Sequence, residues 1–206
     1  MRISKEAIER KNEILDVSEK LFITKGYDKA TINDILVEVG IAKGTFYYYF
    51  KSKEEVMDAI IARIVDEGVQ KAKLVLADNS IPTQEKIVAI IQSFSRNEEK
   101  DIKMLEQLHQ VENAMLHVRS LVQTILAIAP LLTTVVEKGI EEGIFHTPYP
   151  RESTDLILLA GQTCFDEGLF HWTEEEAIAR AKAFIRMVEL TLGAKEGSMM
   201  CLLNIF

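Results

Sequence analysis

Apolar residues recur at intervals of three and four along most of the chain, which is the spacing of one face of an α-helix. The first of these stripes lies between Lys5 and Lys25, with charged residues on the opposite face. Gly26 follows at once, where a left-handed helix cap is expected. Long tracts rich in Ile, Leu, Ala, Glu and Lys, with only 10 Gly and 4 Pro, are not typical of strands and their turns. The pattern predicts an all-α protein of about nine helices.

Two short helices separated by a glycine turn are predicted between Thr31 and Tyr49. Thr31 is a good N-cap, and Asp34 three residues later completes a capping-box pattern. The apolar face of the first helix ends at Gly40, and the second helix is expected from about Ala42 to Tyr49. Two helices joined in this way form the helix-turn-helix pattern.

A long helix is expected to begin after Ser52 and to continue to about Leu76, with Glu55 completing a second capping box. Further helices are predicted over residues 83–97, 101–121 (continuing towards 138), 152–170 and 173–192. Pro130 either kinks the long tract or opens a separate helix. The apolar tail after Gly193 either packs on the helical body or is disordered.

The last two predicted helices are rich in small and apolar residues. Gly161 and Gly168 are seven residues apart, on one helix face, where they would allow a second helix to come close. Alternatively, Gly168 marks the fraying end of its helix. The apolar residues that exceed one buried stripe are Leu156, Leu158, Leu159, Phe165, Leu169, Phe184, Met187, Val188 and Leu192. This surplus predicts a dimer surface on the last two helices.

The net charge of −8 argues against nucleic acid as a partner until its distribution is considered. Residues 1–55 hold ten basic and ten acidic residues, so the whole negative charge lies in residues 56–206. Between Glu38 and Glu54 there are three lysines and no acidic residue. Salt screens the acidic remainder beyond roughly 8 Å, so this local positive excess is sufficient for a phosphate-binding surface.

The second helix of the predicted pair divides its side chains between two faces. Phe46 and Phe50 are four residues apart and share a face, on which they are expected to be buried together with Ile41. Lys43 and Tyr47 share a different face. The division predicts an anchored helix whose other side can meet a partner.

Three consecutive tyrosines, Tyr47 to Tyr49, cannot all be buried, because a helix has one inward face and a buried phenol needs a hydrogen-bond partner. One or two of them are expected to point outward, where the hydroxyl can donate to a phosphate and the ring can cover a thymine methyl. The alternative is that all three pack against the body. Gly44 lowers helix stability by about 1 kcal/mol relative to Ala, and its missing side chain suits the close approach of a base or sugar–phosphate edge.

The run GIAKGTFYYYFKSKEEV, residues 40–56, closely resembles the signature of the TetR family of bacterial transcriptional repressors. In that signature Lys-Gly-Thr precedes an apolar residue, a tyrosine and further aromatic residues, and a Ser-Lys-Glu opening of the fourth helix follows. The similarity covers roughly residues 8–60, and beyond residue 75 only length and helical layout are similar. It implies a helix-turn-helix DNA-binding domain, residues 1–53, and an effector-binding and dimerisation domain, residues 54–206, linked by the helix over residues 52–76.

Carried over residue by residue, the resemblance implies a surface that binds double-stranded operator DNA. The positions that it assigns to DNA contact are Thr31, Lys43, Gly44, Thr45, Tyr47, Tyr48, Tyr49, Lys51 and Lys53. Lys43 to Thr45 would lie at the groove-entering end of the recognition helix. Tyr48 matches a base-contacting position, whereas Thr31, the other two tyrosines and the two later lysines match phosphate-contacting positions.

The resemblance also implies a homodimer, formed through the last two helices, that binds two half-sites of a palindrome about 34–36 Å apart. The body is expected to enclose an apolar pocket with a few polar anchors for an unidentified small-molecule effector. Candidate lining residues are Met104, His109, Glu112, Met115, Gln162, Phe165 and Asp166. His109 and Glu112, one turn apart, either meet the ligand or form an exposed or mutually satisfied pair. Ligand binding would shift the dimer towards a state with lower operator affinity.

Other classes of function find little support in the sequence. No GxSxG, P-loop or GxGxxG motif is present, so an enzyme is not expected. The four histidines show no metal-binding grouping, and Cys164 and Cys201 offer neither a disulfide framework nor a zinc site, so no metal or cofactor is expected. With no charged-then-apolar leader and no run approaching about 18 apolar residues, we expect a cytoplasmic protein without a membrane partner.

Two other interpretations of the helix-turn-helix stay open from the sequence. A protein of this family that has lost operator binding would act as a co-regulator through protein contacts, although the retained Lys43, Gly44 and Thr45 argue against that role. A DNA-organising protein would occupy many sites on the chromosome instead of one or two.

Overall fold

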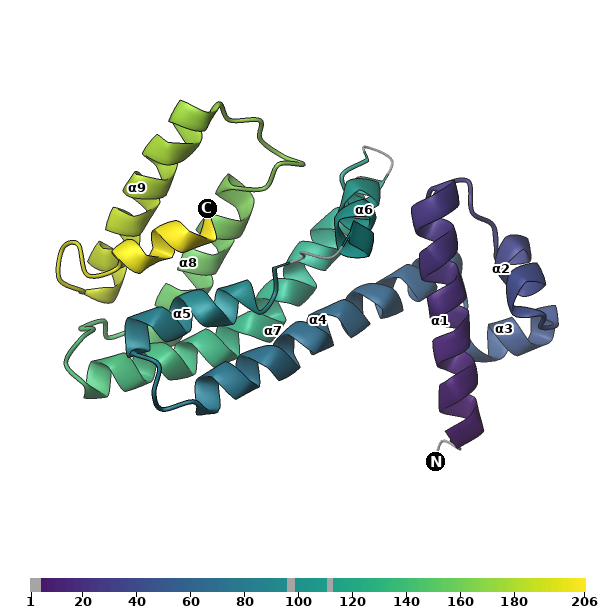
Figure 1. Cartoon of the computed structure of the whole chain (residues 1–206), viewed down its shortest axis with the longest axis horizontal. Helices are drawn as coiled ribbons and strands as arrows, with labels where there is room; N and C mark the ends of the chain where they lie inside the picture. Colours follow the sequence, from purple (N-terminus) through teal and green to yellow (C-terminus); the bar gives the residue numbers. More distant parts are fainter. Residues whose placement is uncertain (1–4, 96–98, 111–112) are drawn as a thin grey trace. The chain divides into compact units, whose positions relative to one another are not determined.

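The computed structural model describes residues 5–95, 99–110 and 113–206, and within these ranges the regular elements are helices (Figure 1). Nine α-helices and one 3-10 helix, η2, are found in these ranges. Their bounds are α1 Lys5–Lys25, α2 Ile32–Val39, α3 Lys43–Tyr49, α4 Lys53–Ala77, α5 Thr83–Gln92, α6 Glu99–Leu108, α7 Ala114–Glu141, α8 Pro150–Cys164, α9 Glu174–Leu192 and η2 Met200–Ile205. The all-α prediction is confirmed.

Packing divides the chain into two compact units. The first contains α1, α2, α3, α6 and the beginnings of α4 and α7, and the second contains α5, α8, α9, η2 and the remainders of α4 and α7. Both α4 and α7 are therefore shared between the units. The functional boundary predicted between residues 53 and 54 is a different kind of division, and it stays a prediction.

The first unit is organised around the buried face of α1. Ile14 and Phe22 of that face are fully buried. The buried residues contributed by α2, α3 and α4 include Ile35, Phe46, Phe50, Val56, Met57, Ile60 and Ile61. Burying side chains of this size contributes about 1.5–3 kcal/mol each. Arg63 of α4 adds two ion pairs to α1, at 2.5 Å from Asp16 and 2.5 Å from Glu19.

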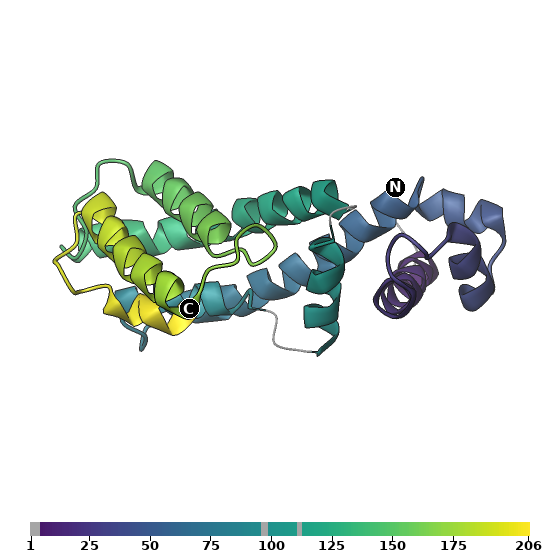
Figure 2. The ribbon, with the colours of Figure 1, turned by 90° about the horizontal axis from the view of Figure 1, so that it is seen from above.

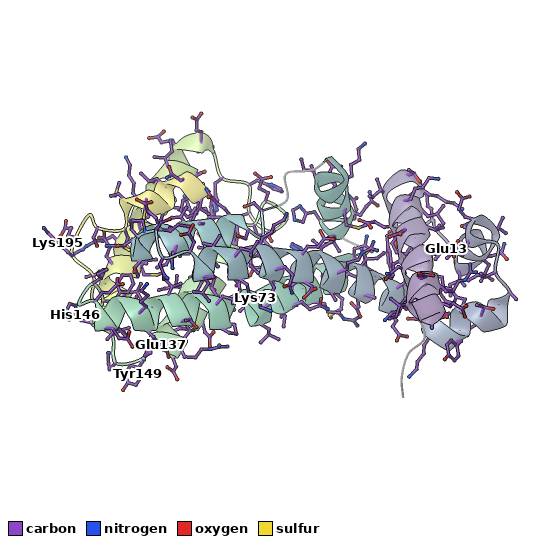
Figure 3. The ribbon with its side chains drawn as sticks, turned by 60° about the horizontal axis from the view of Figure 1, so that its bottom comes forward. Glu13, Lys73, Glu137, His146, Tyr149 and Lys195 are labelled. Atoms are coloured by element: carbon purple, nitrogen blue, oxygen red, sulfur yellow. The ribbon has the colours of Figure 1, made fainter. Side chains whose placement is uncertain are left out.

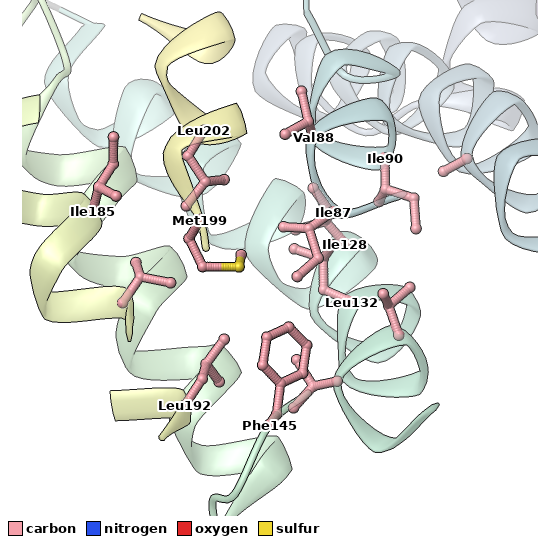
Figure 4. Packing of buried hydrophobic residues seen from close by; sticks show 14 residues of the cluster. Ile87, Val88, Ile90, Ile128, Leu132, Phe145, Ile185, Leu192, Met199 and Leu202 are labelled. Atoms are coloured by element: carbon pink, nitrogen blue, oxygen red, sulfur yellow. The ribbon is translucent and has the colours of Figure 1, made fainter. Parts of the chain in front are cut away.

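The second unit is built on one apolar cluster, shown in Figure 4. Its buried members are Ala72, Ile87, Val88, Ile90, Ile128, Leu132, Val135, Val136, Phe145, Ile185, Val188, Leu192, Met199 and Leu202. Within this unit α8 and α9 lie side by side (Figures 1 and 2). Val188 and Leu192 lie on the inward stripe of α9, so the prediction that these two residues belong to a dimer surface is wrong.

The long helical tract predicted from residue 101 towards 138 forms two helices, since α6 ends at Leu108 and α7 begins at Ala114. Asn113 ends the first piece, since its side-chain Nδ2 donates to the Gln107 carbonyl at 2.7 Å and its backbone N–H donates to the Gln110 carbonyl at 2.9 Å. Pro130 removes one backbone donor, but α7 continues through it. The buried neighbours Ala129 and Leu132 hold this part of α7 in the core. The alternative in which Pro130 opens a separate helix is wrong, and a kink at Pro130 stays a prediction.

The helix α8 ends at Cys164, six residues before the predicted end at 170. Trp172 Nε1 donates to the Cys164 carbonyl at 2.8 Å, and Asp166 Oδ1 accepts from the Gly168 N–H at 2.8 Å, so the chain turns instead of continuing as a helix. Gly168 therefore lies beyond the helix, as the alternative interpretation has it. Gly161 does permit a close approach, because a Cβ there would lie 2.8 Å from the Phe184 ring.

The end of α9 is fixed against the connection between α7 and α8. Gly193 adopts a left-handed conformation with φ of 62°, and a Cβ at this position would lie 3.0 Å from His146. The His146 N–H donates to the Leu192 carbonyl at 2.8 Å, and His146 and Lys195 lie at the same end of this unit (Figure 3). From here the tail folds back as η2, so the packed alternative for the tail is correct.

By length and composition alone, one helix in the described ranges, α7, is long and apolar enough to cross a membrane. This criterion admits polar residues, so α7 meets it although the helix contains no uninterrupted run of about 18 apolar residues. In this fold α7 supplies Ile128, Leu132, Val135 and Val136 to the cluster of the second unit. A helix buried in this way inside a folded core meets the same criteria of length and composition.

Candidate nucleic-acid interface

The N-terminus of α2 is fixed by the predicted capping box. Thr31 Oγ1 accepts from the Asp34 N–H at 3.1 Å, and Asp34 Oδ2 accepts from the Thr31 N–H at 2.8 Å. Lys25 Nζ donates to the same Asp34 oxygen at 2.6 Å. The bond from Lys25 and those from Thr31 hold the pKa of Asp34 at about 2. The exposed Thr31 is thereby held in place at the start of α2.

The turn between α2 and α3 lies at Gly40, as predicted from the sequence. Gly40 is left-handed, with φ of 73°, and its N–H donates to the Leu36 carbonyl at 3.0 Å. Ile41 is only half-buried, so the expectation that it is buried together with Phe46 and Phe50 is wrong. The burial that anchors α3 comes from Phe46, which is fully buried, and from Phe50, which is almost so.

The opposite face of α3 is open to solvent. Lys43 and Gly44 are exposed, and a Cβ built on Gly44 would meet no other atom within 4 Å. Lys43 Nζ lies 5.9 Å from the centroid of the Tyr47 ring, as their shared face predicts. Thr45, the next residue along, is half-buried. The predicted division of α3 into an inward and an outward face is confirmed.

The three tyrosines divide between surface and interior. Tyr48 is 69% exposed and Tyr47 is 44% exposed, whereas Tyr49 is half-buried with its ring centroid 4.9 Å from that of Tyr48. Two of the three point outward, and the alternative in which all three pack against the body is excluded. An exposed phenol beside a lysine and a bare glycine offers a donor, an aromatic plate and access for a backbone or base edge.

The two lysines that precede and open α4 occupy different surroundings. Lys51 is exposed, and among the described residues its side chain makes no ion pair. The predicted capping box is half realised: the Glu55 N–H donates to Ser52 Oγ at 3.2 Å, but Glu55 Oε2 accepts from the Lys51 N–H, at 2.6 Å, instead of that of Ser52.

The side chain of Lys53 is held by hydrogen bonds within the protein. Its ammonium donates to the carbonyls of Tyr27 at 2.7 Å, Ala30 at 3.1 Å and Asp28 at 3.4 Å. It also lies 4.2 Å from the centroid of the Tyr27 ring. Lys53 thereby ties the start of α4 to the segment that leads into α2. A phosphate contact by Lys53 remains a prediction, and sequence reasoning missed this internal role because 23 to 26 residues separate the partners.

The predicted effector residues fall in both units and are described within each. In the first unit Met104 is fully buried, Met115 is largely exposed, and the half-buried His109 ring lies 4.8 Å from that of His117. Glu112 lies outside the described residues, so its pairing with His109 stays a prediction. The assignment of all these residues to an effector site is likewise still a prediction.

In the second unit the candidates Gln162, Phe165 and Asp166 are half-buried. Gln162 Nε2 donates to the Leu121 carbonyl at 3.5 Å, and Asp166 is used in the turn that ends α8. Phe165 lies in an aromatic group, with its ring centroid 5.8 Å from that of Phe184.

Comparison with known proteins gives matches at both ends of the chain. Residues 14–60 match the family described as bacterial regulatory proteins, tetR family, and residues 95–187 match the tetracyclin repressor-like C-terminal domain. The chain belongs to the TetR family of transcriptional regulators. The predicted recognition is confirmed, and with it the expectation of a DNA-binding regulator and not an enzyme.

Individual relatives of this TetR-family protein agree with that assignment. An uncharacterised HTH-type transcriptional regulator of Bacillus subtilis, YhgD, is 27% identical over 189 residues, covering 89% of this chain and 95% of its own. The HTH-type transcriptional repressor BepR of Brucella suis is 24% identical, covering 77% of this chain and 79% of its own. The solved structure of GusR from Salmonella enterica has the same fold, with a TM-score of 0.60 at 16% identity, over 94% of this chain and all of that one.

Proposed function

We propose that this TetR-family protein is a ligand-responsive repressor that acts in the cytoplasm and binds a palindromic operator as a homodimer. The observation that carries the proposal is the outward face of α3. Lys43, Gly44, Tyr47 and Tyr48 are exposed on it, while the buried Phe46 anchors the helix from behind. A short helix presented in this way suits the major groove, where an exposed side chain can reach base edges.

Each exposed group on this surface has a chemical role in the proposal. The ammonium groups of Lys43 and Lys51 neutralise phosphates, which supplies affinity without sequence preference. Tyr48, the most exposed of the three tyrosines, meets base edges or a thymine methyl. In the proposal the exposed Thr31, at the N-terminus of α2, lies at a phosphate, where the helix dipole favours an anion.

Dimerisation is proposed through α8 and α9. Apolar side chains on these helices remain exposed in the single chain, and they are Leu156, Leu159, Ile178, Met187 and Leu190. Burying such a surface against a second copy would remove it from water. Twofold symmetry then presents two copies of α3 to two half-sites about 34–36 Å apart, or a multiple of that distance.

The ligand response is proposed to act as a population shift between dimer states that differ in operator affinity. Support comes from α4, a single helix from Lys53 to Ala77 that contributes to both compact units. A change in the second unit can therefore bias the first through one continuous element. The relative BepR is named a repressor, which favours repression here as well.

The test is selection of genomic DNA fragments by the purified full-length protein, followed by sequencing of the retained fragments. The proposal expects one or a few sites that share an inverted repeat. Retention of many unrelated fragments would indicate a DNA-organising protein, and retention of none would indicate a co-regulator that works through protein contacts. Either result would contradict the proposed function.

A further inference from the structure

The C-terminal segment, residues 199–206, lies partly inside the second unit. Met199 is 0% exposed and Leu202 is 3% exposed. Both belong to the apolar cluster that includes Ile87 of α5, Ile128 of α7 and Ile185 of α9, and Figure 4 shows Met199 in the middle of these side chains. The side chains of Met199 and Leu202 thus fill the space between these three helices.

The last residue of the segment completes an aromatic group. The Phe206 ring centroid lies 4.2 Å from that of Phe165 and 5.9 Å from that of Phe184. These two partners come from the end of α8 and from α9, and they already contact each other. Phe165 is also one of the residues predicted from the sequence to meet an effector. Met199 and Leu202 therefore lie in an apolar core, and Phe206, which is 47% exposed, borders that core at an aromatic group open to solvent; apolar and aromatic side chains of this kind line small-molecule sites.

Apolar burial holds the segment in place, and the hydrogen bonds described between it and the helices are long. It is a 3-10 helix, whose hydrogen-bond geometry is poorer than that of an α-helix. Its contacts to the helices include a bond from Gln92 Nε2 to the Asn204 carbonyl at 3.2 Å, and one from Cys201 Sγ to the Gln84 carbonyl at 3.8 Å. Contacts of this kind allow the segment to leave without unfolding an α-helix.

A buried carboxylate marks the beginning of the segment. Glu189 of α9 is 2% exposed, and its Oε1 accepts from the Met199 N–H at 3.2 Å. Its other oxygen, Oε2, accepts from Arg186 Nη1 at 3.1 Å. If the segment moved away, Glu189 would keep Arg186 as a partner and present one free acceptor to the vacated space. A buried acceptor without a donor is unfavourable, so an incoming molecule with a donor would be selected.

We propose that the effector site of this regulator is the space that Met199, Leu202 and Phe206 occupy, and that the C-terminal segment is its built-in occupant. The ligand is an apolar molecule with one hydrogen-bond donor. Its apolar body replaces the three side chains, and its donor meets Glu189 Oε1 in place of the Met199 N–H. The inference rests on the proposed ligand response and assigns that response a site and a ligand class.

Competition between segment and ligand gives the first test. The Gln84→Cys variant, in a Cys164→Ser background, introduces a thiol at the residue whose backbone carbonyl Cys201 Sγ contacts at 3.8 Å, and a disulfide between the two cysteines would tether the segment to α5. The probe is N-phenyl-1-naphthylamine, an uncharged apolar molecule with a single N–H donor. Its affinity is measured by fluorescence with the variant oxidised, and again after reduction, with the disulfide confirmed by mass spectrometry.

Because apparent affinity falls with the fraction of protein whose site is open, the oxidised protein should bind the probe at least about tenfold more weakly than the reduced protein. The reduced protein should match its Cys164→Ser parent. Equal affinity in the oxidised and reduced states, or no probe binding by the parent, would overturn the proposal.

A second pair of variants loosens the segment instead of tethering it. Leu202→Asp puts a charge at a buried position, whereas Leu203→Asp makes the same change at the neighbouring residue, which is 39% exposed. The proposal expects Leu202→Asp to raise probe affinity by about tenfold and Leu203→Asp to leave it unchanged. The same affinity in both variants would contradict it.

Probe binding is measured without DNA, so its outcome is separate from that of the genomic selection. A site that opens and closes as described supports this inference even if no operator is retained. Conversely, retention of an operator together with equal probe affinity in the oxidised and reduced states would support the proposed function and overturn the effector site proposed here.

Discussion

The ammonium of Lys53 lies 4.2 Å from the centroid of the Tyr27 ring and donates to the Tyr27 carbonyl at 2.7 Å. The start of α4 is thereby joined to the segment between α1 and α2, just before the capped start of α2. This connection gives the helix-turn-helix a fixed relation to α4 inside the first unit. It also separates two lysines that look alike in the sequence, Lys51 and Lys53.

Replacing each of these lysines by methionine should have different consequences. Lys53→Met removes donors from three backbone carbonyls and should lower the free energy of unfolding by about 1.5–3 kcal/mol, the usual contribution of hydrogen bonds to a charged group. Lys51→Met is the matched control and should leave stability within about 0.5 kcal/mol of wild type. Urea unfolding followed by circular dichroism measures both. Equal stability of the two variants would contradict the internal role of Lys53.

Gly44→Ala should separate folding from DNA binding. A Cβ at this position meets no atom within 4 Å, and alanine is the better helix former, so the variant should be more stable by up to about 1 kcal/mol. Its operator affinity should nevertheless fall, because the methyl group occupies the space left for the DNA backbone or a base. Thermal unfolding and a binding titration report the two effects. A gain in stability with unchanged operator affinity would remove Gly44 from the interface.

Gly139→Ala provides a contrasting glycine control for stability, since a Cβ there would lie 2.2 Å from the buried Phe145 ring. Overpacking of this kind should destabilise the protein by about 1–3 kcal/mol. A gain in stability for Gly44→Ala and a loss for Gly139→Ala would show that Gly139 is required for packing and Gly44 is not.

Asp34 should make stability depend on pH in the acid range. Its bonds from Lys25 and Thr31 lower its pKa from 3.8 to about 2 in the folded protein. A depressed pKa means that this stabilisation is present above the ordinary value and is lost as the pH falls from about 4 towards 2. The stability advantage of wild type over Asp34→Asn, measured by urea unfolding, should therefore be constant above about pH 5 and shrink below it. An advantage that stays the same down to pH 3 would show that the carboxylate charge is not involved.

Leu190→Asp should break the proposed dimer. Leu190 is 66% exposed on α9, and a charge there would have to be buried at the interface. Leu74→Asp is the matched control, because Leu74 is 75% exposed on α4. Analytical ultracentrifugation should find monomers for the first variant and dimers for the second. Dimers in both cases would place the interface elsewhere.

Structural features that depend on residues close together in the chain were predictable from the sequence. Contacts between distant residues were not. The capping box of Thr31 and Asp34 and the left-handed glycine after α2 are local, and they set the helix-turn-helix correctly. The end of α6 depends on the Asn113 side chain reaching Gln107, a contact that leaves no mark on hydrophobic periodicity.

The candidate interface follows the same division. Helical spacing was sufficient to separate Phe46 from Tyr47 on α3, because the two faces of a single helix depend only on residue number. The pairing of Arg63 with Asp16 and Glu19, 47 and 44 residues away, required the folded chain. The residue composition likewise indicated that the tail is apolar, but not that Met199 and Leu202 enter the core.

The proposed function depends above all on the binding of operator DNA by the outward face of α3. Its most direct test is the affinity of the selected operator duplex, measured by fluorescence anisotropy at several salt concentrations, for Lys43→Ala and Tyr47→Ala. Lys73→Ala and Tyr149→Ala serve as controls, since both residues are exposed in the second unit.

Both α3 variants should bind the operator at least about tenfold more weakly, with unchanged helicity and dimerisation, as expected for a lost bond to a charged phosphate. The salt slope of Lys43→Ala should also fall by about one. The two controls should bind like wild type. Wild-type affinity in both Lys43→Ala and Tyr47→Ala would show that this face of α3 does not bind the operator.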